Sequence, residues 1–439
     1  MTADDRVRRR FSLFATVIFA ASLFAKTFFF AGSEPVAINY ALTTLSLALA
    51  AALLLPRIAE IPFDRVAGGI LLVAVAWTGF SGFESGITLN LVAVLTFAIA
   101  AFGFGFILPA LVFVGRREPT IMIRNVLSVL SVGSILLLVL APDLAIDPDS
   151  GRIAGAYVSV AVASSMFGFA AILTLRSALI AQRRALVWLW GGVSAISFIL
   201  LYLTRTRSSL VEVLVTALVI VSFTPLSRGL RLVVMSFTGL LLVAATAGAA
   251  VVSTGVLAID DQLAEFRLAD RSLSDSRQGI WTFGIERIAA QPLFGEGLLA
   301  KQTQGGTATV DFSRPSSYDP RYDPHSLILS FGVEGGIPFM ILMTGLFILI
   351  PARFVYAFGW RLALQTPEFV IVTARLLVSI FAGGDMTTLG NIVEKTIWIL
   401  LGTMMLKAEL KLRGNSTNGV ASAWPSRGIP PAMSGGGHP

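Results

Sequence analysis

The chain of 439 residues is 55% hydrophobic and 13% charged, and its mean hydropathy is +0.80. Because a soluble domain carries about 25% charged residues, this composition excludes an ordinary soluble protein and predicts an integral membrane protein. The sequence contains no cysteine, which excludes disulfides and thiolate metal sites. The net charge of +7 does not indicate nucleic-acid binding, since the basic residues form short clusters between apolar segments.

The basic N-terminal segment MTADDRVRRR precedes an apolar segment from Phe11 to about Ala31. One interpretation is a secretory signal peptide, whose apolar core is usually about 7–15 residues long. This apolar segment is longer, and Lys26 interrupts its end, where a cleavage site would need small residues. We therefore interpret it as an uncleaved first membrane span.

Apolar segments of about 20 residues, each long enough to cross a ~30 Å hydrocarbon core, recur along the chain. They predict an all-α, polytopic membrane protein with about twelve transmembrane helices. The predicted spans are residues 11–31, 36–55, 66–81, 89–113, 119–140, 153–174, 186–204, 208–224, 232–254, 327–350, 369–385 and 393–406.

The connections between these spans alternate in charge. One set is basic and contains the N-terminal arginines, Arg57, Arg65, Arg116, Arg117, Arg176, Arg183, Arg184, Arg228, Arg231, Arg353, Arg361, Lys407, Lys411 and Arg413. The other set, which includes GSEP, GFESGIT and PDLAIDPDSGR, is poor in basic residues. The positive-inside rule therefore places the basic set and both termini in the cytoplasm.

This topology divides the chain into four parts. Residues 1–254 form spans one to nine, 255–326 a large outer loop, 327–413 spans ten to twelve, and 414–439 a tail of disordered composition. In the loop, RQGIWTFGIERIAAQPLFGEG has apolar residues Ile280, Trp281, Ile285 and Ile288 at helical spacing, followed by Pro292, Gly295 and Gly297. We expect an amphipathic helix with its apolar face on the membrane surface, ended by a turn.

Arg205 and Arg207, in YLTRTRSSLVEV, depart from the charge rule because their turn belongs to the outer set. One explanation is snorkelling, in which a long side chain carries its charge to the headgroups. Two arginines on one tight turn, on the disfavoured side, favour a functional role instead. Glu212 is a candidate intramembrane partner for Arg205.

His325, in YDPHSLILSFGVEGGIPF, is the only histidine besides His438 of the tail. It could be an interfacial histidine that only bonds a backbone carbonyl, but imidazole is also the side chain best suited to proton exchange near neutral pH. One histidine cannot form a metal site, and no neighbouring carboxylates have ligand spacing. We expect no metal and no cofactor.

Together these features resemble the family of O-antigen ligases and O-antigen polymerases. The motif T-x-[ST]-R matches Thr204 to Arg207, and R-x-x-x-W…P-x-x-G-x-G matches Arg277, Trp281, Pro292, Gly295 and Gly297. The motif H-[NS]-x9-G matches His325, Ser326 and Gly336, with Glu334 before the final glycine. The motif R-x-x-G matches Arg152 and Gly155. Ser326 replaces the commoner asparagine, and the asparagine that often follows R-x-x-G is absent. The resemblance is most specific over residues 200–340.

The resemblance implies a metal-independent glycosyltransferase of the bacterial inner membrane with a periplasmic active site. Such enzymes move a glycan from a polyprenyl-diphosphate carrier to a sugar hydroxyl. The resemblance also implies catalytic roles for Arg207 and His325, with His325 acting as a base or orienting the acceptor hydroxyl. It implies binding of diphosphate or glycan by Arg205, Arg277 and Arg152, and structural roles for the other motif residues.

Within the family, a ligase attaches O-antigen to lipid A–core, whereas a polymerase joins repeat units of O-antigen or exopolysaccharide. The twelve-span plan with one late loop favours a ligase, and the polymerase remains open. A rival glycosyltransferase class places acidic residues in the first outer loop, where this chain has only Glu34. A transporter or flippase should show repeat-related halves, broken helices or paired charges at the membrane midplane. Arg375, in the predicted eleventh span, supports that alternative best.

Overall fold

The computed structural model describes residues 3–27, 35–84, 90–115, 117–147, 151–157, 159–225, 235, 239, 273–298, 324, 326–382 and 392–416. This part of the chain is helical, and its one strand-like feature is an isolated bridge between Ile146 and Ile153. The helices are α1 (Ala3–Thr27), α2 (Pro35–Leu54), η1 (Leu55–Glu60), α3 (Arg65–Glu84), α4 (Asn90–Ala98), η2 (Ile99–Ile107), α5 (Leu108–Val114), α6 (Pro119–Leu140), α7 (Pro142–Ala145), α8 (Val160–Ile180), α9 (Arg184–Leu203), α10 (Arg207–Phe223), α13 (Leu273–Ala290), α14 (Leu327–Phe358), α15 (Trp360–Ala363), α16 (Pro367–Ala382) and α17 (Ile392–Ser416). The predicted all-α class is confirmed.

Five helices of the described part are long and apolar enough to cross a membrane: Val94–Val114, Pro119–Leu140, Val160–Ile180, Arg184–Leu203 and Leu327–Phe358. Shorter apolar stretches of the described residues, Thr44–Ala59, Arg65–Ser81 and Ser208–Phe223, fall on the spans predicted at 36–55, 66–81 and 208–224. The spans predicted at 11–31, 369–385 and 393–406 overlap α1, α16 and α17, and 232–254 lies almost wholly outside the described residues. The membrane-protein class is supported, while the number of twelve spans stays a prediction.

The span predicted at 153–174 begins later, at Val160. Gly151 and Gly155 have positive φ angles of 64° and 60°, so the segment before Val160 turns instead of coiling. Ser159 then caps the helix, because its side chain accepts a hydrogen bond from the Val162 amide.

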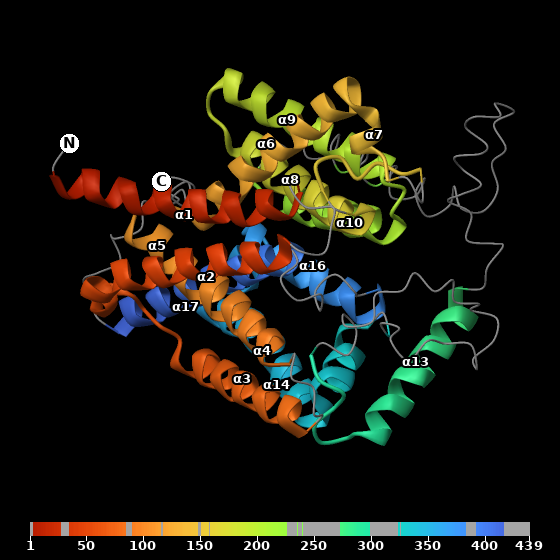
Figure 1. Ribbon diagram of the computed structural model, residues 1–439. Coiled ribbons are helices and arrows are strands. Elements are labelled where there is room, and N and C mark those ends of the chain that lie inside the picture. Colours follow the sequence, from red (N-terminus) through yellow and green to blue (C-terminus); the bar gives the residue numbers. More distant parts are fainter. Residues whose placement is uncertain are drawn as a thin grey trace, which may run out of the picture.

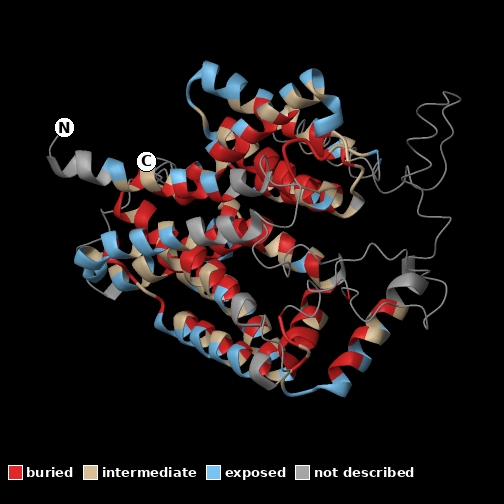
Figure 2. Cartoon of the chain, in the orientation of Figure 1, coloured by how far each residue is buried: buried red, intermediate tan, exposed pale blue. Residues whose placement is uncertain are grey.

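The long helices form a bundle in which α1 begins and α17 ends on the same side (Figure 1). Buried aromatic side chains such as Phe104, Phe167, Phe339 and Phe354 fill its interior. Figure 2 shows exposed residues along the outer sides of α3 and α9, and many of these are large and apolar, including Phe80, Leu72 and Trp188. An apolar exterior around a packed core is the arrangement that a lipid environment favours.

Ion pairs join the helix ends that carry the basic loops. Arg353 contacts Asp64 at 2.7 Å and Glu409 at 3.2 Å. Lys407 contacts Glu368 at 2.6 Å and also lies 3.5 Å from Glu118. All these residues lie in, or at the helix ends beside, loops that the sequence predicts to be cytoplasmic. Two basic residues at this end, Arg353 and Lys407, therefore neutralise the buried carboxylates of Asp64 and Glu368.

Candidate functional site

The turn between α9 and α10 contains Thr204, Arg205 and Thr206. The Arg205 amide donates to the Tyr202 carbonyl at 3.0 Å, and the buried Thr204 hydroxyl donates to the Leu201 carbonyl at 2.7 Å. Arg205 has a φ of 54°, the one positive φ of a residue other than glycine in the described part. A left-handed conformation costs about 1–2 kcal/mol for an L-residue with a side chain. The turn holds an arginine where glycine would be free of strain.

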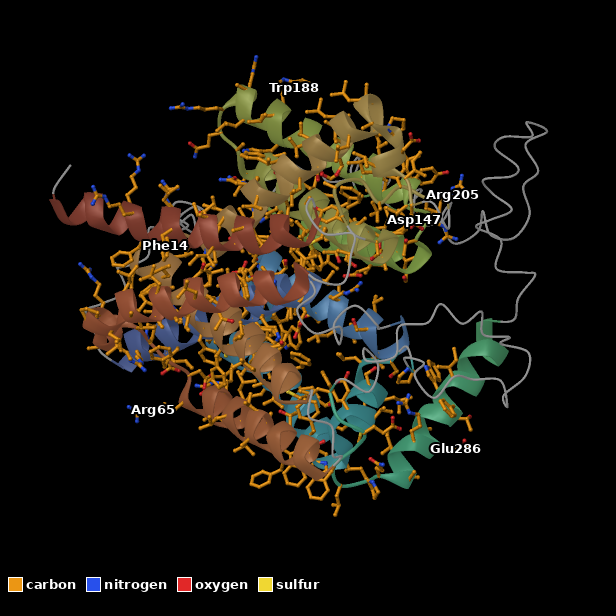
Figure 3. All side chains as sticks on the ribbon, viewed as in Figure 1. Phe14, Arg65, Asp147, Trp188, Arg205 and Glu286 are labelled. Atoms are coloured by element: carbon orange, nitrogen blue, oxygen red, sulfur yellow. The ribbon has the colours of Figure 1, made fainter. Side chains whose placement is uncertain are left out.

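Arg205 and Arg65 lie at opposite ends of the bundle, and Asp147 lies at the same end as Arg205 (Figure 3). Arg65 belongs to the predicted cytoplasmic set of loops, and Asp147 and Arg205 to the outer set. The arrangement in space therefore agrees with the alternation of loops along the chain. We call the end that carries Arg205 the arginine end.

Arg207 is the first residue of α10, and Arg277 lies in α13. The side chains of both arginines, and the whole of His325, lie outside the described residues. Leu327 begins α14 two residues after His325, so the helix start that follows this histidine is defined.

Glu212 of α10 pairs with Arg375 of α16, with 2.9 Å between its Oε2 atom and Nη1 of the arginine. Both side chains are 5% exposed. The sequence offered Arg205 as the partner of Glu212 and gave no account of Arg375. The structure pairs Glu212 with Arg375 across neighbouring helices, and the pairing of Glu212 with Arg205 stays a prediction.

Arg152 lies in a tight turn before α8. Its carbonyl accepts from the Asp147 amide at 2.8 Å, and the Gly151 amide donates to the Asp147 carbonyl at 2.9 Å. Gly155 packs so closely on α6 that an added Cβ would stand 2.6 Å from the Ser134 hydroxyl oxygen. These contacts place a half-buried Arg152 at the arginine end of the bundle, beside a glycine that no larger residue can replace without rearrangement.

The same turn leads into Tyr157, which is buried and packs edge-on against Phe167 with ring centroids 5.2 Å apart. Burial raises the pKa of the Tyr157 phenol above its ordinary value, because the charged form would lose its hydration. This tyrosine therefore stays neutral and acts as a packing residue.

Helix α14 is broken at Gly336, whose φ of 74° and ψ of −175° are not helical. The break frees backbone groups that would otherwise bond within the helix. The turn formed by residues 292–297 satisfies three of them: Glu296 N donates to Val333 O at 2.7 Å, Gly297 N to Glu334 O at 3.0 Å, and Ile337 N to Pro292 O at 2.7 Å. Two motifs recognised separately in the sequence are thus bonded to each other.

Glycines make this close approach possible. Gly295 has a φ of 65°, and a Cβ added to it would stand 2.6 Å from the Gly336 nitrogen. Gly297 has a φ of 94°, which also favours glycine. The structure therefore brings together Pro292, Gly295, Gly297, Glu334 and Gly336, all of them residues for which the sequence predicted a structural role.

Helix α3 completes the junction between the turn 292–297 and the break in α14 with residues that sequence reasoning missed. Trp77 donates its indole N–H to the Gly335 carbonyl at 2.9 Å, and its ring stacks on Phe294 at 5.4 Å. The Ser81 hydroxyl donates to the Phe294 carbonyl. In the sequence both residues lie in an ordinary apolar span, and no motif distinguishes them.

The expected helix after Arg277 is present as α13, which begins earlier, at Leu273. Its apolar residues do not share one membrane-facing side. Ile280 and Ile288 are buried, Trp281 is half-buried, and Ile285 is 57% exposed. Ile288 packs against Gly332 of α14, where an added Cβ would stand 2.4 Å from it. The expectation that this face lies on the membrane is wrong for Ile288, because the helix uses it to pack on protein.

A second missed contact holds the end of α13. Arg287 is bonded to Glu296 through two of its guanidinium nitrogens, with 2.7 Å between Nε and Oε1. The arginine side chain is 6% exposed. This pair connects α13 directly to the turn 292–297.

Glu334 and Glu394 line a small cavity of about 20 Å³ whose other walls are chiefly aromatic, including Phe331, Phe339 and Trp398. The Trp398 indole donates to Glu394 at 3.4 Å. Such a volume holds about one water molecule and not a sugar ring. In the described part of the chain, no group of three His, Cys, Asp or Glu residues could hold a metal ion.

Residues 192–344 match the family described as O-antigen ligase. The matched segment contains the turn with Arg205, helices α10 and α13, the turn 292–297 and the broken part of α14. The family resemblance expected from the sequence is thereby confirmed for this segment, while Arg152 lies outside it. No curated protein matches the chain.

Proposed function

From its O-antigen ligase domain, we propose that this protein is an inner-membrane glycosyltransferase that moves a glycan from a polyprenyl-diphosphate carrier to a sugar hydroxyl. The acceptor is lipid A–core, so that the enzyme acts as an O-antigen ligase on the periplasmic face. The observation that carries the proposal is Arg205, which has a φ of 54° inside the matched segment. An arginine in a strained position that glycine would occupy freely points to a role for its guanidinium.

The chemistry calls for fixed positive charge. The acceptor oxygen forms a bond to the anomeric carbon, while the bond from that carbon to the diphosphate breaks and its electron pair stays on the phosphate oxygen. Guanidinium groups bind such oxygens through two parallel hydrogen bonds and remain charged. Near a membrane, where little water competes, they stabilise the growing negative charge more strongly. Arg205 and Arg207 hold the diphosphate, and Arg277 and Arg152 add contacts to diphosphate or glycan.

His325 acts on the acceptor hydroxyl. It either takes the hydroxyl proton as the new bond forms or orients the hydroxyl by a hydrogen bond. The junction between the turn 292–297 and the break in α14 supports this role, because it fixes α13, which carries Arg277, relative to the helix that follows His325.

The periplasmic location rests on the loop charges. The loops rich in arginine and lysine are cytoplasmic by the positive-inside rule. Arg205 lies at the end of the bundle opposite Arg65, a member of that set (Figure 3). The proposed site therefore faces the periplasm, where the transferase would join the lipid-linked glycan to lipid A–core.

A polymerase that extends O-antigen or exopolysaccharide would use the same donor chemistry, and the matched family fits it as well. A flippase has less support. Its expected broken helix exists at Gly336, where the turn 292–297 and Trp77 bond the freed backbone groups. The buried pair of Arg375 and Glu212 is of a kind that a transporter also shows, so the family match over residues 192–344 is what favours the transferase.

Deletion of the protein, followed by gel analysis of lipopolysaccharide, tests the proposal. We expect O-antigen bands to disappear and carrier-linked polymer to accumulate. A single repeat unit attached to lipid A–core would instead identify a polymerase of O-antigen. Unchanged lipopolysaccharide with loss of secreted polysaccharide would identify a polymerase of exopolysaccharide, and accumulation of carrier-linked glycan on the cytoplasmic side would favour a flippase.

A further inference from the structure

Two buried polar contacts hold the first two turns of α10. Glu212 pairs with Arg375 of α16 at 2.9 Å. Ser209, one turn nearer the start of the helix, lies 3.0 Å from Ser164 of α8, oxygen to oxygen. All four residues are no more than 5% exposed. The helix that begins with Arg207 is therefore attached on two sides immediately after that residue.

The ion pair of Glu212 and Arg375 costs more folding free energy to bury than an apolar contact would. Removing a carboxylate and a guanidinium from water carries a large desolvation penalty, and a well-packed apolar pair in their place is often as stable or more stable. Packing alone therefore does not explain why the pair is present. Unlike leucine or valine, which pack at several helix positions, an ion pair is satisfied at only one height and one rotation of α10 relative to α16.

The height of α10 determines where the arginines lie, because the turn before Arg207 is only three residues long and is anchored by Thr204. The other side of α10 also has little freedom. Gly168 of α8 lies so close that an added Cβ would stand 2.6 Å from Val213. A shift of α10 would move Arg207 directly and strain the turn that contains Arg205.

Building on the proposed function, we propose that Glu212 and Arg375 are positioning residues whose ion pair holds the turn of Arg205 and Arg207 in place for the diphosphate. Neither residue touches the substrate in this proposal. A displacement of about 1 Å in a catalytic arrangement can lower the rate about 10²-fold, so a loss of that order is expected without the pair.

The test compares the parent with the double variant E212L/R375M, which removes both charges and leaves neither one unpaired. We expect normal membrane abundance and a thermal midpoint near that of the parent. With carrier-linked glycan in reconstituted membranes, kcat should fall about 10²-fold, while KM for the carrier changes much less because both arginines remain. Equal kcat in the double variant and the parent would overturn the proposal.

A disulfide can replace the ion pair, because the native chain has no cysteine to interfere. Cysteines at positions 164 and 209 (S164C/S209C) join α8 to α10 where the serine oxygens are 3.0 Å apart. Oxidation should restore most of kcat when this pair is added to E212L/R375M, and reduction should remove it again. Failure of the cross-linked protein to recover would mean that Arg375 does more than position α10, and the proposal would be wrong.

The rate of cross-linking, measured without substrate, separates this proposal from the proposed function. It should be fast in S164C/S209C alone and slower when the ion pair is also removed. Equal rates would show that the pair does not hold α10, whether or not the protein is a transferase. If E212L/R375M does not accumulate, the neutral variant E212Q/R375Q supports the same comparisons. A parent without transfer activity would contradict the proposed function alone.

Discussion

Gly336 of α14 lies directly against Leu293 of the turn that follows α13. A Cβ added to Gly336 would stand 2.2 Å from the Leu293 carbonyl oxygen, and the φ of Gly336 is 74°. A larger residue would therefore be strained in its backbone and would separate the turn from the helix. Both effects act at the point where the motif segments of α13 and α14 are hydrogen-bonded together.

We predict that Gly336→Ala lowers the free energy of unfolding by at least about 2 kcal/mol, from strain and steric overlap together. Thermal unfolding in detergent measures this, and transfer activity should fall as well. Gly345→Ala is the matched control, because Gly345 lies in the same helix with nothing within 4 Å of the added Cβ. If the two variants unfolded at the same temperature as the parent, the junction would be less rigid than the structure indicates.

Length and apolarity were sufficient to predict most of the helices. Each predicted span in the described part coincides with a helix because a membrane-crossing segment satisfies its backbone hydrogen bonds internally. The start of α8 was predicted too early, since apolar residues continue through the turn after Gly151. Hydropathy does not register the positive φ angles that keep this turn out of the helix.

The contacts within the site were less predictable. Glu212 and Arg375 are 163 residues apart, and no local pattern connects them. Trp77 bonds to Gly335 across 258 residues through a backbone carbonyl, which leaves no trace in side-chain chemistry. The sequence indicated which glycines belong to motifs, but only the packing of the turn 292–297 on α14 explains why they must be glycine.

Topology can be tested with single cysteines, because the chain has none of its own. Cysteines at Ser272, Gly305 and Ser317 should react with a membrane-impermeant thiol reagent in cells whose outer membrane is permeabilised. Cysteines at Arg116 and Arg183 should react only after lysis. The opposite pattern would place the large loop in the cytoplasm and contradict the transferase proposal.

Arg207→Lys separates charge from geometry. Lysine keeps the positive charge but loses the planar fork that binds two phosphate oxygens at once. We predict a loss of transfer of about 10²-fold or more at normal membrane abundance, and at least as large a loss for Arg207→Ala. Arg361→Lys, at an exposed position of the predicted cytoplasmic set, is the control and should be fully active. Parent-like activity in Arg207→Ala would support snorkelling as the role of the turn.

Arg205→Gly tests whether strain is retained for function. Glycine adopts a φ of 54° without penalty, whereas alanine keeps the strain. The glycine variant should therefore be more stable than Arg205→Ala by about 1 kcal/mol, although both lose transfer activity. Thermal midpoints and single-turnover rates are measured on the same preparations. An active Arg205→Gly enzyme would show that the guanidinium is not needed.

Variants of His325 distinguish orientation of the acceptor from acceptance of its proton. The test is sharp because the only other histidine is His438 near the C-terminus. If the imidazole orients the acceptor, His325→Asn and His325→Gln should keep part of the single-turnover rate, and His325→Ala should lose most of it. If it takes the proton, all three variants should fail. In that case the parent's rate should fall as the pH drops through about 6.5, since a protonated imidazole cannot act as a base. Binding of the carrier should survive in every variant because the arginines are intact. Full transfer by His325→Ala would remove the histidine from the mechanism.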